Sequence, residues 1–211
     1  MQAIIFSEYG SPDVLQCAEI EKPAPARNEI LIRVYAASIN PLDFHNMRGS
    51  PCLIRLQSGL RRPKNPRLGV ALSGEVEVVG QDVTDFQPGD AVFGVRTGAL
   101  AEYVITTGKA FAPKPSNLTF EQAAVVPVAG LTALQGLRDK GKLQPGHTLL
   151  VNGAAGGVGT FAVQIARAIG AEITAVTSTP NLELVRSLGA HHVVDYTREN
   201  FTRSGQRYDL I

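Results

Sequence analysis

The sequence has few of the features that mark secreted, membrane-bound or nucleic-acid-binding proteins. Its two cysteines, Cys17 and Cys52, are too few for a disulfide framework or a four-cysteine zinc site. Twenty lysines and arginines nearly balance 19 aspartates and glutamates, and a net charge of +1 gives no general attraction to nucleic acids or membrane surfaces. The N-terminus lacks the basic start and long apolar run of a secretory signal. We therefore expect a cytoplasmic protein with reduced thiols and with no membrane or nucleic-acid partner.

No stretch of the chain predicts a membrane span. Residues 148–169 come nearest, but they contain several glycines and the polar residues Asn152, Gln164 and Arg167. Hydrophobic residues make up 44% of the chain and charged residues 18%, which is typical of an ordinary globular core. A length of 211 residues allows one large domain or two small ones.

The most informative segment is a glycine-rich turn between the apolar run 148–152 and a helical pattern that stops at Gly170. Gly153 can adopt backbone angles that a residue with a Cβ resists, so the chain can reverse after the strand. Gly156 leaves room for phosphate oxygens, and Gly159 lets the helix pack tightly on the strand. The free N–H groups and the dipole of the helix start then bind an anion. This order of strand, turn and helix predicts a dinucleotide site formed by Gly153, Ala155, Gly156, Gly157, Val158 and Gly159.

The pattern of the chain changes near residue 116. Residues 1–115 contain short strand candidates, such as 29–37, 72–79 and 91–95, separated by prolines and glycines as in a small barrel. The following residues begin with a capping box at Thr119 and Gln122, which predicts a helix that Pro127 interrupts and a second helix from about residue 129 to residue 140.

Strands and helices then alternate to the end of the chain. The strand candidates are residues 148–152, 172–177 and 192–195, and residues 208–211 look like the start of a fourth. Such alternation predicts a parallel sheet with right-handed crossovers. Because a full doubly wound sheet has about six strands, we expect the sequence to be cut short.

Together, several segments resemble the medium-chain dehydrogenase/reductase superfamily: residues 36–43, 88–94, 98–104, 130–134 and 152–159. Within it, the chain is similar to the zinc-free quinone oxidoreductase branch, near zeta-crystallin and the reticulon-4-interacting reductases. The resemblance implies an α/β protein with a GroES-like catalytic β-barrel domain (residues 1–115) and a partial Rossmann domain that binds NADP(H) (residues 116–211). It also implies a missing C-terminal third, and we expect the full-length protein to form a homodimer.

Comparison with the zinc-dependent members of the superfamily predicts that no metal is bound. Those members place Cys, then His-Glu, then Cys or Asp around a catalytic zinc. Here residues 39–43 lack the cysteine, Gly69-Val70-Ala71 stands where Gly-His-Glu would be, and Ala129 precedes Gly130 where the third ligand would lie. A catalytic zinc needs three protein ligands. The four histidines have no ligand spacing.

The segment after the second strand of the alternating half favours NADP(H) over NAD(H). An NAD-binding protein places an acidic residue about 20 residues beyond the glycines, and none occurs from Ile173 to Leu182. Thr177-Ser178-Thr179-Pro180-Asn181 leaves room for a 2′-phosphate near the Thr179 hydroxyl. By resemblance, Ser178 and Tyr196 would contact that phosphate. Arg198 could supply a positive charge, or it could be a solvated loop arginine.

Without a metal, the oxygen that gains charge during hydride transfer needs hydrogen-bond donors. The candidates are the Asn40 amide and Arg48, with Asp43 orienting Asn40 or a water. Asp43 could equally be a carboxylate at the start of a helix after Pro41. By resemblance, Thr132 lies near the nicotinamide, although a helix cap or a core contact is an equal alternative.

These observations favour an oxidoreductase that uses NAD(P)H to transfer a hydride to a small quinone or an α,β-unsaturated carbonyl, without zinc. The first alternative is an NADP-dependent alcohol dehydrogenase or enoyl reductase of the same branch. The second is a non-catalytic protein that binds NADPH or RNA, as some zeta-crystallins do. The basic tract Leu60–Arg67 predicts an exposed loop, with attraction of an anionic substrate as the alternative. We expect the 211-residue chain alone to have little activity, because its sheet would have an open edge.

Overall fold

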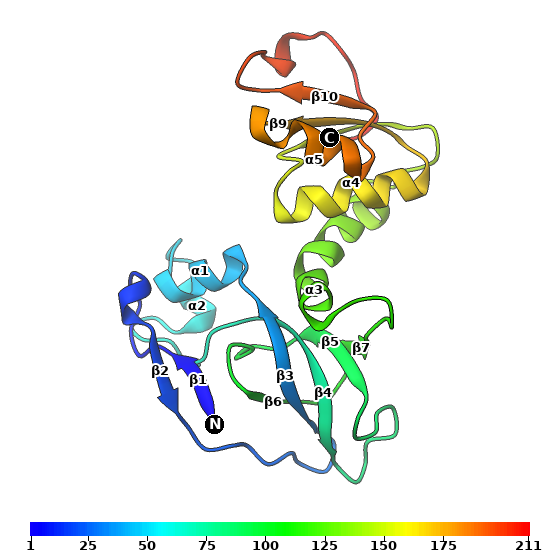
Figure 1. Ribbon diagram of the computed structural model, residues 1–211. Helices are drawn as coiled ribbons and strands as arrows, with labels where there is room; N and C mark the ends of the chain where they lie inside the picture. Colours follow the sequence, from blue (N-terminus) through cyan, green and yellow to red (C-terminus); the bar gives the residue numbers. More distant parts are fainter. The chain divides into compact units, whose positions relative to one another are not determined.

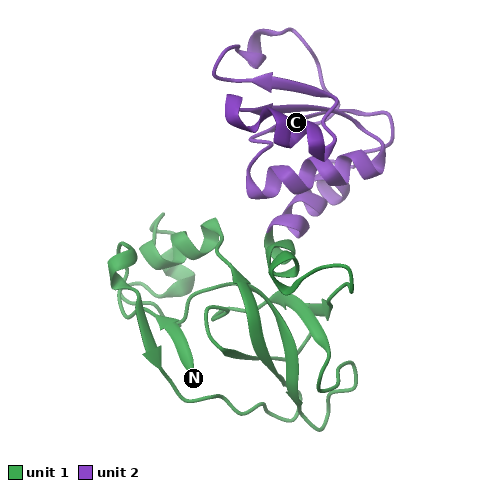
Figure 2. Cartoon of the chain, viewed as in Figure 1, with its two compact units in different colours: residues 1–128 green, residues 129–211 purple.

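The structure, a computed structural model that describes residues 1–211, consists of two compact units. Unit 1 comprises Met1–Val128 and unit 2 comprises Ala129–Ile211 (Figure 2). Each unit has its own hydrophobic core. Helix α3 (Phe120–Leu134) includes the division between them.

Unit 1 is built on antiparallel strands (Figure 1). Five of them form one sheet in the order β6 (Tyr103–Thr106), β3 (Ile30–Ser38), β4 (Ala71–Val79), β5 (Ala91–Val95), β7 (Phe111–Pro113). A separate pair is formed by β1 (Gln2–Ile5) and β2 (Gln16–Glu19). One face of the large sheet supplies the core, because alternate residues of a strand point to the same side; its buried members include Ile30, Ile32, Leu72, Val76, Val92 and Val104. The predicted strands 72–79 and 91–95 are confirmed, whereas β2, β7 and the short helix α2 (Ile54–Ser58) were not predicted, since such short segments carry little periodicity.

Helix α1 (Pro41–Arg48) begins shortly after β3 and carries two of the candidate catalytic residues, Asp43 and Arg48. Asn40 precedes it in an extended conformation, with φ −126° and ψ 160°, and Pro41 fits the first helical position because its missing N–H has no helical partner there. The helix ends at Gly49, whose left-handed φ of 58° favours glycine.

Helix α3 corrects one prediction, because Pro127 lies inside it and does not interrupt it. A proline removes one helical hydrogen bond and displaces the preceding turn. Here the Ser38 hydroxyl donates to the Ala124 carbonyl at 2.9 Å, so a carbonyl next to the disturbed turn is paired from β3. The predicted capping box is confirmed: the Thr119 N–H donates to the Gln122 side chain at 3.0 Å, and the Gln122 N–H donates to the Thr119 hydroxyl at 3.2 Å. The chain continues as a π-helix, η2 (Gln135–Lys140).

Unit 2 confirms the predicted parallel sheet. Its strands lie in the order β10 (His192–Asp195), β9 (Glu172–Thr177), β8 (Thr148–Asn152), and both pairings are parallel. They alternate with the helices α4 (Gly157–Ile169) and α5 (Leu182–Leu188), which end at the left-handed glycines Gly170 and Gly189. Short 3₁₀ turns are formed by Thr179–Asn181 and Phe201–Arg203. Leu149, Ile173, Val163 and Val185 are among the fully or nearly fully buried residues that hold this unit together.

Strand β8 has neighbours on both sides. β9 pairs with one edge, and Leu210 forms a parallel bridge to Leu149 on the other. The predicted fourth strand is therefore present only as this bridge. The chain adds β9 and β10 on one side of β8 and then the Leu210 segment on its other side. The carboxyl end of β8 is therefore a topological switch point, where α/β sheets bind their ligands. None of the helices combines the length and apolar character that crossing a bilayer requires.

Candidate functional site

The glycine-rich turn follows β8 at the switch point and is hydrogen-bonded to the end of β9. The N–H groups of Gly153 and Ala154 both donate to the Val176 carbonyl, at 3.1 and 3.0 Å. Gly153 has a φ of 74°, as predicted for a sharp reversal. A Cβ added to Gly159 would lie 2.3 Å from the Gly153 carbonyl oxygen, so the helix does approach closely, but it packs against the turn itself and not only against the strand.

The start of α4 presents unpaired amides. Gly156 is the N-cap residue, and the N–H groups of Gly157, Val158 and Gly159 make no hydrogen bond within the protein. A Cβ on Gly157 would meet nothing within 4 Å, and one on Gly156 would meet only the Gly153 carbonyl at 3.3 Å. Three free donors, the positive end of the helix dipole and open space together make this a site for an anion such as a diphosphate.

The predicted 2′-phosphate residues lie on two neighbouring segments at the same edge of the sheet. Ser178 directly follows β9, and the Tyr196 N–H donates to the Thr177 carbonyl at 3.1 Å, which places the turn after β10 beside it. The amide of Asn181 donates to the Ser178 hydroxyl oxygen at 3.3 Å, so the Ser178 proton is free to point elsewhere. The side chain of Arg198 is 75% exposed. The structure therefore brings Ser178, Tyr196 and Arg198 into one region near the glycine turn.

Asp195 is a buried residue of this region that the sequence analysis did not single out. Its carboxylate accepts hydrogen bonds from the Thr179 hydroxyl and the Thr197 hydroxyl, and the Arg198 Nε lies 3.6 Å away. The Thr179 bond is the main reason why the pKa of Asp195 lies below its usual range. Thr179 thus gives its proton to Asp195. The only sequence feature that could have drawn attention to Asp195 is its place as an acidic residue at the end of the third parallel strand.

Thr132 lies on α3 in unit 2 and lines a mostly apolar groove of about 380 Å³. Val158, from the start of α4, and Asn152, from the end of β8, line the same groove. Thr132 therefore lines the same groove as Val158, one of the residues at the start of α4.

In unit 1, Asp43 holds the main chain at the entrance of α1. Its Oδ2 accepts the Asn40 N–H at 2.8 Å, and the carboxylate is almost completely buried, with 1% exposed. Oδ1 has no hydrogen-bond partner. Burial raises the pKa of Asp43 above its ordinary value, and hydrogen bonding by backbone amides, chiefly that of Asn40, only partly opposes this shift. Asp43 therefore holds the backbone of Asn40 at the start of α1.

Asn40 and Arg48, the other two candidate catalytic residues of unit 1, contact different groups. The Asn40 amide donates to the carbonyl and the hydroxyl of Ser38, both at 3.2 Å. Arg48 is exposed and its guanidinium lies 4.6 Å from the centre of the Phe44 ring.

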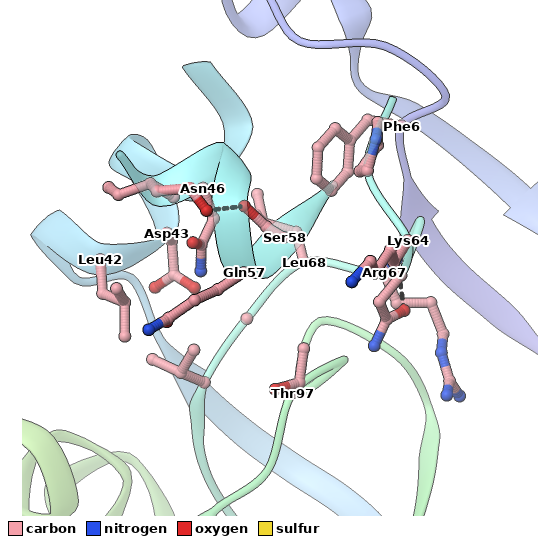
Figure 3. A pocket seen from close by; sticks show the side chains of 15 residues that line it. Phe6, Leu42, Asp43, Asn46, Gln57, Ser58, Lys64, Arg67, Leu68 and Thr97 are labelled. Atoms are coloured by element: carbon pink, nitrogen blue, oxygen red, sulfur yellow. Dashed lines mark hydrogen bonds between the residues drawn. The ribbon is translucent and has the colours of Figure 1, made fainter. Parts of the chain in front are cut away.

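Asp43 also lines a half-open cavity of about 400 Å³ in unit 1 (Figure 3). Asn46 and Gln57, from α1 and α2, lie on the same side of it, and Lys64 and Arg67 lie on the opposite side. Part of the basic tract 60–67, expected to be an exposed loop or to attract an anionic substrate, therefore lines this cavity. No three His, Cys, Asp or Glu side chains are grouped so that they could hold a metal ion.

We expect Asp43→Asn to gain stability relative to the unchanged chain as pH rises. A carboxyl with a raised pKa binds its proton more tightly in the folded state, so its contribution is present below the unfolded pKa and is lost as pH rises through the folded pKa. Urea unfolding between about pH 4 and about pH 8 measures the difference. Asp209→Asn is the control: Thr148 lowers the pKa of Asp209, so the contribution of this carboxyl is lost only as pH falls below about 4, and the Asp209→Asn difference should stay constant across this range. A pH-independent difference for Asp43→Asn would contradict this expectation.

Two family models match the chain. Residues 26–116 match the alcohol dehydrogenase GroES-like domain, and residues 157–207 match the zinc-binding dehydrogenase model. Among curated proteins, the 2-methylene-furan-3-one reductase of Solanum lycopersicum is 36% identical over all of this chain and 56% of that protein. The chloroplast envelope quinone oxidoreductase homolog of Arabidopsis thaliana is also 36% identical, over all of this chain and 67% of that protein.

A solved structure is similar as well. The quinone oxidoreductase of Escherichia coli complexed with NADPH superposes with a TM-score of 0.83 at 31% identity, covering 95% of this chain and 60% of that one. The chain thus spans 56% and 67% of the lengths of the two curated relatives.

Proposed function

Because this chain belongs to the medium-chain dehydrogenase/reductase superfamily, we propose that it functions as an NADPH-dependent oxidoreductase that transfers a hydride to a quinone or an α,β-unsaturated carbonyl without zinc. Membership confirms the predicted architecture of a GroES-like domain followed by a Rossmann-type parallel sheet. The observation that carries the proposal is the set of free amides at Gly157, Val158 and Gly159, which face open space at the switch point.

The preference for NADP(H) rests on the edge formed by β9 and β10. No acidic residue occurs from Ser178 to Leu182, directly after β9, where a carboxylate would bind the ribose hydroxyls of NAD. Ser178, Tyr196 and Arg198 instead offer hydroxyl and guanidinium groups to a phosphate. The Escherichia coli relative is a complex with NADPH, which supports the same choice.

The substrate class is inferred from the relatives and from the residues of unit 1. One relative is named for quinones, and the other for a ketone that bears a neighbouring methylene group. The nicotinamide supplies the hydride when it is bound. We propose that Asp43 fixes the backbone of Asn40. Asn40 and Arg48 then donate hydrogen bonds to the oxygen that gains negative charge, and Thr132 lies near the nicotinamide. Val70 occupies the position of a zinc ligand in metal-dependent members, which supports chemistry without zinc.

The direct test titrates the 211-residue chain with NADPH and then measures NADPH oxidation with a small para-quinone and with an enone. We expect saturable NADPH binding and quinone- or enone-dependent oxidation that is slow in the 211-residue chain and that a zinc chelator leaves unchanged. Absence of NADPH binding would refute the proposal. Binding without oxidation by any acceptor would favour the non-catalytic alternative, and stoichiometric zinc with chelator-sensitive turnover would refute the metal-free mechanism.

Arg198→Ala should weaken NADPH binding about tenfold and leave NADH binding unchanged, because only NADPH carries the phosphate that the guanidinium would bond. Fluorescence titration with both cofactors measures the two dissociation constants. Arg186→Ala is the matched control, since Arg186 is an exposed arginine on α5 that pairs with Glu183 and lies outside this edge. An equal loss for both cofactors would show that Arg198 does not contact the 2′-phosphate.

A further inference from the structure

Asp195 joins the two strand ends that carry the proposed phosphate contacts. It is the last residue of β10, lies beside Thr177 of β9, and is buried with 6% exposed. Its Oδ2 accepts the Thr179 hydroxyl at 2.5 Å, while its Oδ1 accepts the Thr197 N–H at 2.9 Å and hydroxyl at 2.7 Å. One carboxylate therefore ties the loop after β9 to the turn after β10.

The residues that this carboxylate holds are neighbours of the proposed phosphate donors. Ser178 precedes Thr179, and Thr197 lies between Tyr196 and Arg198. Fixing Thr179 and Thr197 limits how far the two segments can rotate or separate. The Arg198 Nε lies 3.6 Å from the same carboxylate, and the side chain remains largely exposed.

The negative charge of Asp195 is balanced by hydrogen bonds from its neighbours and by Arg198. Both threonine hydroxyls give it their protons, which leaves neither of them a free donor for a phosphate. Arg198 offsets the negative charge from the solvent side. Any effect of Asp195 on an anion would therefore act through Ser178, Tyr196 and Arg198.

We propose that Asp195 is a positioning residue for recognition of the adenosine 2′-phosphate, holding the loop after β9 and the turn after β10 in register. This inference rests on the proposed preference for NADP(H). A residue that only stabilised the sheet would affect ligands with and without the 2′-phosphate alike, so discrimination between them is the diagnostic quantity.

The test uses calorimetric titration of the 211-residue chain with adenosine 2′,5′-bisphosphate and with adenosine 5′-monophosphate. Asp195→Ala should weaken bisphosphate binding about tenfold and monophosphate binding less than about twofold, as expected when hydrogen bonds to a charged group are misplaced. Thr179→Val keeps the charge of Asp195 and removes one of its bonds, so it should lower the bisphosphate affinity about threefold. This second variant keeps the proposal testable if Asp195→Ala does not fold.

Asp209→Asn is the matched control. Asp209 also accepts an N–H and a hydroxyl from one threonine, Thr148, at 2.8 and 2.9 Å, but at the start of β8. It should change stability without changing the ratio of the two affinities. An unchanged ratio in both Asp195→Ala and Thr179→Val, or tighter bisphosphate binding, overturns the inference alone. Equal affinities for the two ligands in the unchanged chain overturn the proposed NADP(H) preference together with it.

Discussion

Gly159→Ala is expected to lower NADPH affinity about 100-fold, which is the cost of misplacing two hydrogen bonds to a charged phosphate. The new Cβ would lie 2.3 Å from the Gly153 carbonyl oxygen and 2.8 Å from backbone atoms of Ala154, so the helix start or the turn must move. Such overpacking also costs about 1–3 kcal/mol of stability. Fluorescence titration gives the affinity, and urea unfolding gives the free energy.

Gly157→Ala separates the two effects of the first substitution. Its Cβ would meet nothing within 4 Å, so the free energy of unfolding should stay within about 0.5 kcal/mol of the unchanged value. NADPH affinity should nevertheless fall about tenfold, because the methyl group would occupy the space next to the free amides. If both alanine variants bound NADPH normally, the diphosphate would not lie over this turn.

Gly153→Val is expected to lower NADPH affinity about thirtyfold, for a conformational reason and not a steric one. No atom lies within 4 Å of a Cβ at this position, but its φ of 74° is strained by about 1–2 kcal/mol for a residue with a branched side chain. Relieving that strain would rotate the Gly153 N–H away from the Val176 carbonyl and shift the start of α4.

Gly153→Asn is the control for this substitution, since asparagine tolerates the left-handed region better than other residues with a side chain. It should retain most of the affinity that Gly153→Val loses, with both measured by the same titration. Equal losses in the two variants would mean that side-chain bulk, and not backbone conformation, decides binding at this position.

Local features of the sequence predicted local features of the structure well. The Thr119–Gln122 capping box, the strand 172–177 and the helix stops at Gly170 and Gly189 depend on neighbouring residues, and each is found as predicted. Pro127 was misjudged because a proline removes only one helical hydrogen bond, and whether the helix continues past it depends on tertiary packing that the local sequence does not show.

The sequence predicted only some of the polar residues of the candidate site and only some of their contacts. Asp43 was expected either to orient Asn40 or a water, or to be a carboxylate at the start of a helix. It lies in the first turn of α1 and accepts the Asn40 N–H, but its unpartnered Oδ1 depends on the packing around it. Asp195 was overlooked because its partner Thr179 is 16 residues away and becomes a neighbour only through the pairing of β9 with β10.

By itself, the sequence determined where the chain reverses and where α4 begins, because glycine's freedom at Gly153 and the lack of a Cβ at Gly159 are properties of single residues. It also determined that no carboxylate lies in the five residues directly after β9, Ser178 to Leu182. Only the tertiary structure decided which hydroxyls and charges share the edge beside that turn. Parallel strands are paired through distant segments, and their register, which sets Asp195 against Thr177, is a property of the assembled sheet.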